Sequence, residues 1–306
     1  LGVSIFALTP APTRSAAIDS PGQPNTRVIV QLNTTPSDAI RAELETLGKV
    51  HGWIDRFQIV AMTPTPHDLQ VIASLPYVVS LQPDDEVELL SVGSWDKDII
   101  DVVDVEESGA VGNPDPREVA ETGSGVHIAL IDTGLGSDWR DVLGDDKVDV
   151  ALARSFVEGA RTANGLSVGP EFPNPLPGNL WEHDFCLHGT AVAAPITGMT
   201  IGSTRVDGVA PGAKLIPLKI IGNGCTSFSL TGHNPQSTTS TLSRVLAAFD
   251  YLIGLKEQHI IGPTILSLSI GLRRRPLAEI GINAVLSAGI IVVQAAGNSG
   301  ELGSEV

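Results

Sequence analysis

Three short motifs carry side chains that could together transfer a proton and stabilise an oxyanion. They are Asp132-Thr133-Gly134, His188-Gly189-Thr190 and Gly297-Asn298-Ser299. A carboxylate can orient a basic partner, an imidazole accepts a proton near neutral pH, and a side-chain amide can donate to a developing oxyanion. Taken singly, each motif also fits a structural role as a turn aspartate, a core or capping histidine, or a turn asparagine.

Two other chemistries would use some of the same residues. Asp-Thr-Gly is the motif of the aspartic peptidases, where two such carboxylates share one proton on an all-β frame. This chain carries the motif once, among alternating strand and helix patterns. His183, Cys186 and His188 have the chemistry of zinc ligands, but no second ligand cluster accompanies them. The aspartic peptidase and zinc interpretations are therefore weaker than one in which a carboxylate, an imidazole and an amide act together.

Buried strands alternating with helices would position these motifs. Nearly continuous apolar runs, typical of strands covered on both faces, occupy residues 126–131, 213–220, 264–270 and 290–296. Helical patterns occupy residues 241–255 and 276–288. This alternation predicts an α/β fold with a parallel sheet and helices on both faces. Because sites in such sheets lie at the carboxyl ends of strands, Asp132 and Asn298 are expected at that edge.

The first part of the chain predicts a separate small α+β domain of the ferredoxin-like type. Its order is β-α-β-β-α-β. Helices are expected over residues 39–47, capped by Ser37 and Asp38, and after Pro66-His67-Asp68. Strands are expected over residues 27–32, 50–57, 58–63 and 77–81, the last with a continuation over 87–90. Residues 138–187 lack a strong period and predict a long surface insertion.

Length and charge narrow the function classes. The 306 residues allow about two domains, and the net charge of −16 makes nucleic acid a poor partner. No stretch has the roughly 18 apolar residues of a membrane helix. Ten carboxylates and one lysine between Asp84 and Glu107 supply −9 of the charge. So dense a run of like charge predicts either an exposed linker or an accessible junction between domains.

The motifs resemble, in register, those of the subtilase family of serine peptidases. Residues 124–134 look like the segment around its catalytic aspartate, and His188-Gly189-Thr190 like its histidine motif. Residues 208–213 are similar to a turn entering a later strand. Ser269-Ile270-Gly271 resembles the strand that binds substrate backbone, and residues 296–300 the oxyanion-hole segment. The domain over residues 27–90 resembles the inhibitory propeptide of the same family.

The resemblance implies a subtilisin-like serine endopeptidase that works by acyl transfer. Asp132 would orient His188 as general base, and Asn298 would donate to the oxyanion. Ser269, Ile270, Gly271 and Gly297 would bind the substrate, a polypeptide. The nucleophilic serine should follow Asn298 by some tens of residues, and no serine of this chain stands in such a context. We therefore expect a fragment, inactive alone, or else an inactive homologue that binds peptides or acts as an inhibitor module.

The resemblance also implies an organisation and a location. Residues 1–26 would be a signal remnant or disordered leader, 27–90 the propeptide, 91–120 an acidic linker and 121–306 the truncated peptidase domain. The propeptide would lay its tail, near Pro83–Leu90, through the active-site cleft. Processing would fall between about Leu89 and Gly109, and the protein would be secreted.

Four further expectations follow from the resemblance and the residues. Cys186 and Cys225 could form a disulfide beside the cleft. Catalysis needs no cofactor, and a structural calcium ion near residues 199–207 is left open. Pro195 should kink or shorten the helix after His188. The run Arg273-Arg274-Arg275 is either a solvated loop or a contact for acidic substrate residues.

Overall fold

The computed structural model describes residues 27–65, 67–89, 121–157, 179–184, 186–222, 239–273 and 275–296. The chain divides into two compact units, residues 1–84 and 85–306, and each is described by itself. Among the described residues no helix is both long and apolar enough to cross a membrane.

The first unit is an antiparallel sheet with two helices. Its elements are β1 (Val28–Leu32), α1 (Asp38–Thr46), β2 (Gly48–Ile54), β3 (Ile59–Pro64), α2 (Leu69–Ser74) and β4 (Val78–Pro83). The strand order β2-β3-β1-β4 confirms the predicted ferredoxin-like arrangement. Ser37 caps α1 as expected, since its hydroxyl accepts from the Ile40 N–H. Between β2 and β3, the predicted tight turn is replaced by a 3₁₀ turn over Asp55–Phe57 and by Gln58 in the left-handed conformation.

The core of the first unit follows from alternation along its strands. Val28, Val30 and Leu32 of β1 face the same side and pack with apolar residues of α1, α2 and the other strands. The first and last described residues of the unit, Arg27 and Asp84, contact each other. The Asp84 N–H donates to the Arg27 carbonyl, and their side chains form an ion pair of 2.6 Å.

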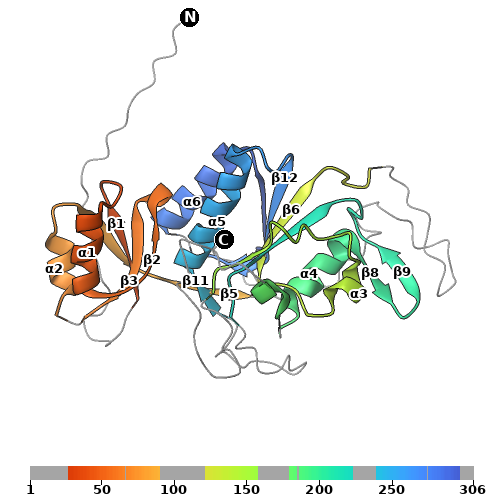
Figure 1. Cartoon of the computed structure of the whole chain (residues 1–306), viewed down its shortest axis with the longest axis horizontal. Helices are drawn as coiled ribbons and strands as arrows, with labels where there is room; N and C mark the ends of the chain where they lie inside the picture. The colour runs from red at the N-terminus through yellow and green to blue at the C-terminus, as the bar shows by residue number, and fades with distance from the viewer. Residues whose placement is uncertain are drawn as a thin grey trace, which may run out of the picture. The chain divides into compact units, whose positions relative to one another are not determined.

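The second unit is built on a five-stranded parallel sheet with the order β14-β12-β6-β10-β7. The strands are β6 (His127–Asp132), β7 (Arg154–Ser155), β10 (Lys214–Lys219), β12 (Thr264–Leu268) and β14 (Ile291–Gln294). Figure 1 shows α5 (Leu242–Glu257) and α6 (Pro276–Ser287) on one side of this sheet and α3 (Trp139–Leu143) and α4 (His188–Thr197) on the other. The predicted α/β architecture is confirmed.

The chain enters the sheet at its centre, through β6. The strand β10 pairs with one edge of β6 and β12 with the other, both in parallel. The carboxyl end of β6 is therefore the point where the strand order reverses, which is where open α/β sheets bind their ligands. Asp132 stands at this point.

Two antiparallel additions lie beside the parallel sheet. One is a hairpin of β8 (Gly198–Ile201) and β9 (Thr204–Asp207). The other has the order β11-β5-β13 and joins β5 (Glu86–Leu89), β11 (Thr239–Thr241) and β13 (Ile270–Gly271). The prediction that residues 87–90 extend the preceding strand was wrong, because β5 pairs with β11 and β13 and not with β4.

Two other expectations are corrected, and Pro195 can be placed. The apolar run over residues 264–270 is not one strand, since β12 ends at Leu268 and Ile270 begins β13 in a different sheet. The stretch over 138–187 is not wholly a surface insertion, because Trp139, Phe156 and Trp181 are buried at 0%, 1% and 2% exposure. Pro195 lies inside α4, and the helix ends two residues after it at Thr197, just before Gly198 with φ 91°, which does not contradict the expected shortening.

Candidate active site

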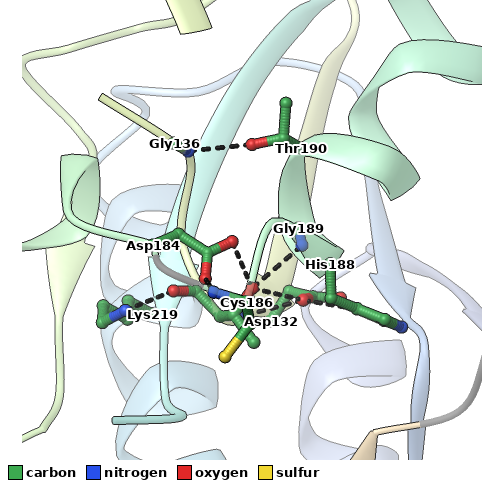
Figure 2. Close-up of polar contacts among 9 residues, drawn as sticks. Asp132, Gly136, Asp184, Cys186, His188, Gly189, Thr190 and Lys219 are labelled. Atoms are coloured by element: carbon green, nitrogen blue, oxygen red, sulfur yellow. Dashed lines mark hydrogen bonds and ion pairs between the residues drawn. The ribbon is translucent and has the colours of Figure 1, made fainter. Parts of the chain in front are cut away.

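Asp132 and His188 come from different elements and meet in a buried hydrogen bond. Asp132 is the last residue of β6, and His188 is the first residue of α4. His188 Nδ1 lies 2.8 Å from Asp132 Oδ1 (Figure 2), and their side chains are 7% and 2% exposed. An ionised carboxylate can only accept, so Nδ1 carries the proton and Nε2 is the basic nitrogen, directed away from Asp132.

The carboxylate of Asp132 is held by its own turn. The Thr133 N–H donates to Asp132 Oδ1 over 2.7 Å, so that one oxygen receives both this bond and the one from His188. Asp132 Oδ2 is buried and accepts no hydrogen bond from the described residues. The two bonds to Oδ1 therefore fix the orientation of the carboxylate.

Small residues around the histidine allow the two motifs to touch. A Cβ on Gly189 would lie 2.0 Å from the Gly134 carbonyl oxygen, closer than any real contact. Gly134 itself has φ 92°, which favours glycine. Thr190 Oγ1 accepts from the Gly136 N–H over 2.8 Å, a second tie between the same two loops (Figure 2). The motif residues next to Asp132 and His188 thus set the approach of β6 to α4.

A second buried carboxylate lies behind the pair, and sequence reasoning missed it. Asp184 is 4% exposed. Thr133 Oγ1 lies 2.6 Å from Asp184 Oδ2 and 3.2 Å from Asp132 Oδ1, so its single proton is directed to Asp184. The same hydroxyl accepts from the Gly189 N–H over 2.9 Å. Thr133 therefore links Asp184 to the turn after β6 and to the start of α4.

Lys219 completes this buried cluster from the neighbouring strand. It is 1% exposed and pairs in register with Asp132, because β10 and β6 are parallel neighbours. Its ammonium donates to the main-chain oxygens of Thr133 and His183. The sequence held one signal of this residue, a lysine that directly follows the apolar residues 215–218 of a predicted strand.

Burial sets the charge balance of the cluster. It lowers the pKa of Lys219 to about 8, against the pull of the negative charges on Asp184 and Asp132. It raises the pKa of Asp184, against the Thr133 hydrogen bond and the Lys219 charge. Each buried charge thus depends on the others, so the cluster behaves as a unit around the Asp132 loop.

An extended strand lies beside the predicted substrate-binding residues. Leu89 pairs with Ile270 and Glu88 with Gly271, while residues of β11 pair with the other edge of β5. Leu268 pairs with Ile131, so the residues that follow them, Ser269 and Asp132, lie at the same edge of the sheet. The strand β5 thus occupies the space between β11 and β13, which we call the groove. Gly297 and Asn298 lie outside the described residues, and their roles stay predictions.

A family model decides the affiliation of the chain. The model of the subtilase family matches residues 123–306, which is more than half of the chain. The chain belongs to the subtilase family. The matched region contains Asp132 and His188, so the resemblance inferred from their motifs is confirmed at the level of the family.

Curated subtilase relatives cover most of this chain but extend well beyond it. The subtilisin-like protease SBT1.2 of Arabidopsis thaliana is 25% identical over 278 residues, 79% of this chain and 32% of its own length. The alkaline protease of Alkalihalobacillus alcalophilus is 27% identical over 241 residues, 76% of this chain and 51% of its own. The extracellular serine proteinase of Thermus sp. (strain Rt41A) is 26% identical over 263 residues, or 83% and 52%. The chain spans about a third to a half of these relatives.

A solved structure supports the subtilase fold. The epidermin leader peptide processing serine protease of Staphylococcus aureus matches with a TM-score of 0.56 and 18% identity. The match covers 91% of this chain and 61% of that one. At this identity the likeness speaks for the fold alone.

Calcium and the disulfide are two further expectations for this subtilase. Among the described residues no three His, Cys, Asp or Glu side chains converge on one point. Residues 199–207 hold one carboxylate, Asp207, and Arg205 there donates to the Leu143 and Thr197 carbonyls. A hard cation takes several oxygen ligands, main-chain carbonyls among them, so calcium at these residues stays open. Cys186 is buried, but Cys225 lies outside the described residues, and the disulfide stays a prediction.

Proposed function

We propose that this chain is part of a serine endopeptidase precursor that cleaves polypeptides by acyl transfer. The observation that carries the proposal is the buried hydrogen bond of 2.8 Å between His188 Nδ1 and Asp132 Oδ1. It supports a base whose Nε2 can take the proton of an attacking serine and then give it to the leaving amine. Asn298 would donate to the oxyanion. We assign no nucleophile among these 306 residues.

The strand β5 supports the precursor part of the proposal. A chain segment that pairs on both edges, with β11 and β13, fills the place that an extended substrate would take. Val87 in its centre is 1% exposed, so the segment is anchored by a buried side chain as well as by backbone bonds. In this proposal residues 85–89 are the inhibitory tail of the first unit and block the site until the linker is cut.

The decisive experiment uses the complete protein that contains this chain. We expect it to react with a fluorophosphonate probe and to hydrolyse peptides after processing. Because the general base is needed for attack, His188→Ala should lower kcat/KM by about 10⁴-fold or more and abolish labelling. His183→Ala is the matched control, since the His183 side chain is exposed and its site contact is through the main chain. Equal activity of His188→Ala and wild type would overturn the proposal.

A second candidate is a non-catalytic homologue that binds extended peptides. The groove between β11 and β13 favours it, because this groove needs no nucleophile to bind a strand. The same experiment separates the two candidates. A complete protein that binds peptides but neither reacts with the probe nor cleaves them would be a binding module.

Secretion is part of the proposal and rests on the named relatives. The Thermus relative is called extracellular, as is a protease of Xanthomonas campestris that is 28% identical over 187 residues. Expression of the complete gene, followed by detection of the protein in the culture medium, tests this. Retention of all the protein inside the cells would contradict it.

A further inference from the structure

Asp85, the residue just before β5, is held by Arg275, which follows β13 in the chain. Arg275 Nε lies 2.7 Å from Asp85 Oδ2, and Arg275 Nη2 lies 3.4 Å from Asp85 Oδ1. The Asp85 side chain is 11% exposed and that of Arg275 is 41% exposed. A two-pronged contact of this kind suits guanidinium and carboxylate better than an ammonium would.

The backbone places Asp85 as the next residue of the same bound segment. The Leu242 N–H, just past β11, donates to the Asp85 carbonyl over 3.0 Å, so the pairing continues one step beyond β5. Successive side chains of a strand alternate between faces, so Asp85 and Val87 belong to the same face. The segment thus presents a carboxylate two residues before a buried aliphatic side chain.

The backbone of Arg275 is fixed at the start of α6. Arg275 stands immediately before Pro276, the first residue of α6, with φ −136° and ψ 148°. It follows β13 by four residues, so the loop that begins at the groove returns the guanidinium towards the segment. This answers the question of the arginine run in part, since Arg275 has a carboxylate partner while Arg273 is exposed.

We propose that Arg275 is a specificity residue of the peptide groove and selects peptides that carry Asp or Glu two positions before a buried aliphatic residue. The inference rests on the proposed function, because it takes the groove of β5 to be the groove of the substrate. The inhibitory tail is then a peptide of the preferred class, with Asp85 and Val87 as its two recognition points.

The first test measures the tail in the intact chain by amide hydrogen exchange over residues 84–90. Arg275→Gln and Asp85→Asn should each speed exchange about fivefold at low ionic strength, the effect of one ion pair of about 1 kcal/mol. The double variant should be no faster than either single one. Arg273→Gln is the matched control in the same loop and should leave exchange unchanged.

The outcomes of this test separate two claims, that the tail is bound in the groove and that Arg275 contributes to its binding. Fast exchange over residues 84–90 in the wild-type chain would show that the tail does not stay bound in the groove. The inhibitory-tail proposal and the role of Arg275 would then both fail. Slow wild-type exchange that Arg275→Gln leaves unchanged would overturn the role of Arg275 alone. The exchanged pair, Asp85→Arg with Arg275→Asp, should restore slow exchange, which loss of folding in a single variant could not mimic.

The second test extends the inference to substrates of the complete, processed protein. Two peptides with the sequence of residues 83–92 are compared, one of them with Asn in place of Asp85. We expect kcat/KM to be about fivefold higher for the aspartate peptide, mainly through KM, and the difference to shrink in high salt. In Arg275→Gln the two peptides should be equivalent. Equal values with wild-type protein would overturn the inference while leaving the endopeptidase proposal in place.

Discussion

At the scale of single residues, the site depends on how closely two loops approach. Asp132 accepts two hydrogen bonds on one oxygen, and the loop of His188 comes close enough because Gly189 has no side chain. Thr133 then ties this turn to Asp184 and to the start of α4. Orientation of the imidazole is therefore a product of packing around it, as well as of the carboxylate itself.

Gly189→Ala should destabilise the chain by about 2–3 kcal/mol, because the new Cβ would overlap the Gly134 carbonyl oxygen, an atom of the backbone that cannot rotate away. The midpoint of urea unfolding measures the effect. Gly222→Ala is the control, since no atom lies within 4 Å of its Cβ position. Equal midpoints for the two variants would contradict the close approach.

Lys219 should make stability depend on pH in the alkaline range. Its pKa is about 8 in the folded chain and 10.5 ordinarily, so between these values the unfolded chain holds more protons. Stability from this residue is then lowest below pH 8 and rises towards pH 10.5, by at most about 1.4 kcal/mol per pH unit. The measurement is the difference in unfolding free energy between wild type and Lys219→Met at several pH values. A difference that stays constant from pH 8 to 10.5 would refute a lowered pKa.

At the scale of elements, strands change partners where the sequence pattern continues unbroken. The chain leaves the parallel sheet after Leu268, and Ile270 begins the edge that pairs with β5. The helices α5 and α6 lie close together at Gly281. A Cβ on Gly281 would lie 2.5 Å from Leu246 Cδ2 and 3.0 Å from Phe249 Cδ2. One glycine therefore sets the spacing of the two helices over the sheet.

Two glycine substitutions test this helix pair. Gly254→Ala in α5 should stabilise the chain by about 0.5–1 kcal/mol, because its Cβ position has no neighbour nearer than 3.8 Å and alanine favours the helix. Gly281→Ala should instead destabilise by about 1 kcal/mol or more, since side chains of α5 must shift. Thermal unfolding of both variants measures the contrast. Stabilisation by both would contradict the tight packing.

At the scale of the whole molecule, the acidic stretch is divided between different uses. Asp84 pairs with Arg27 in the first unit and Asp85 with Arg275 in the second, so the unit boundary falls between two neighbouring ion-paired carboxylates. Both have basic partners, unlike the solvated residues that a linker would supply. The remaining acidic residues from Asp96 to Glu107 lie outside the described residues.

A cut in the acidic stretch should leave the two parts of the chain together. With a specific protease site inserted between Asp98 and Asp101, the N-terminal piece keeps β5 and its pairing with β11 and β13. We expect both pieces to elute as one species in size-exclusion chromatography at micromolar concentration. Arg275→Gln should promote their separation, and Arg273→Gln should not. Separation of the wild-type pieces would contradict retention through β5.

The sequence by itself determined the local features of this protein. Periods of two and 3.6 residues predicted the strands and helices, and short motifs marked Asp132 and His188, because these signals depend on neighbours in the chain. The tertiary structure alone decided that β5 pairs with β13, that Asp184 and Lys219 lie behind Asp132 and His188, and that Arg275 meets Asp85. Asp85 and Arg275 are separated by 190 residues. Contacts of that range follow from how the elements pack, and residue spacing carries no record of them.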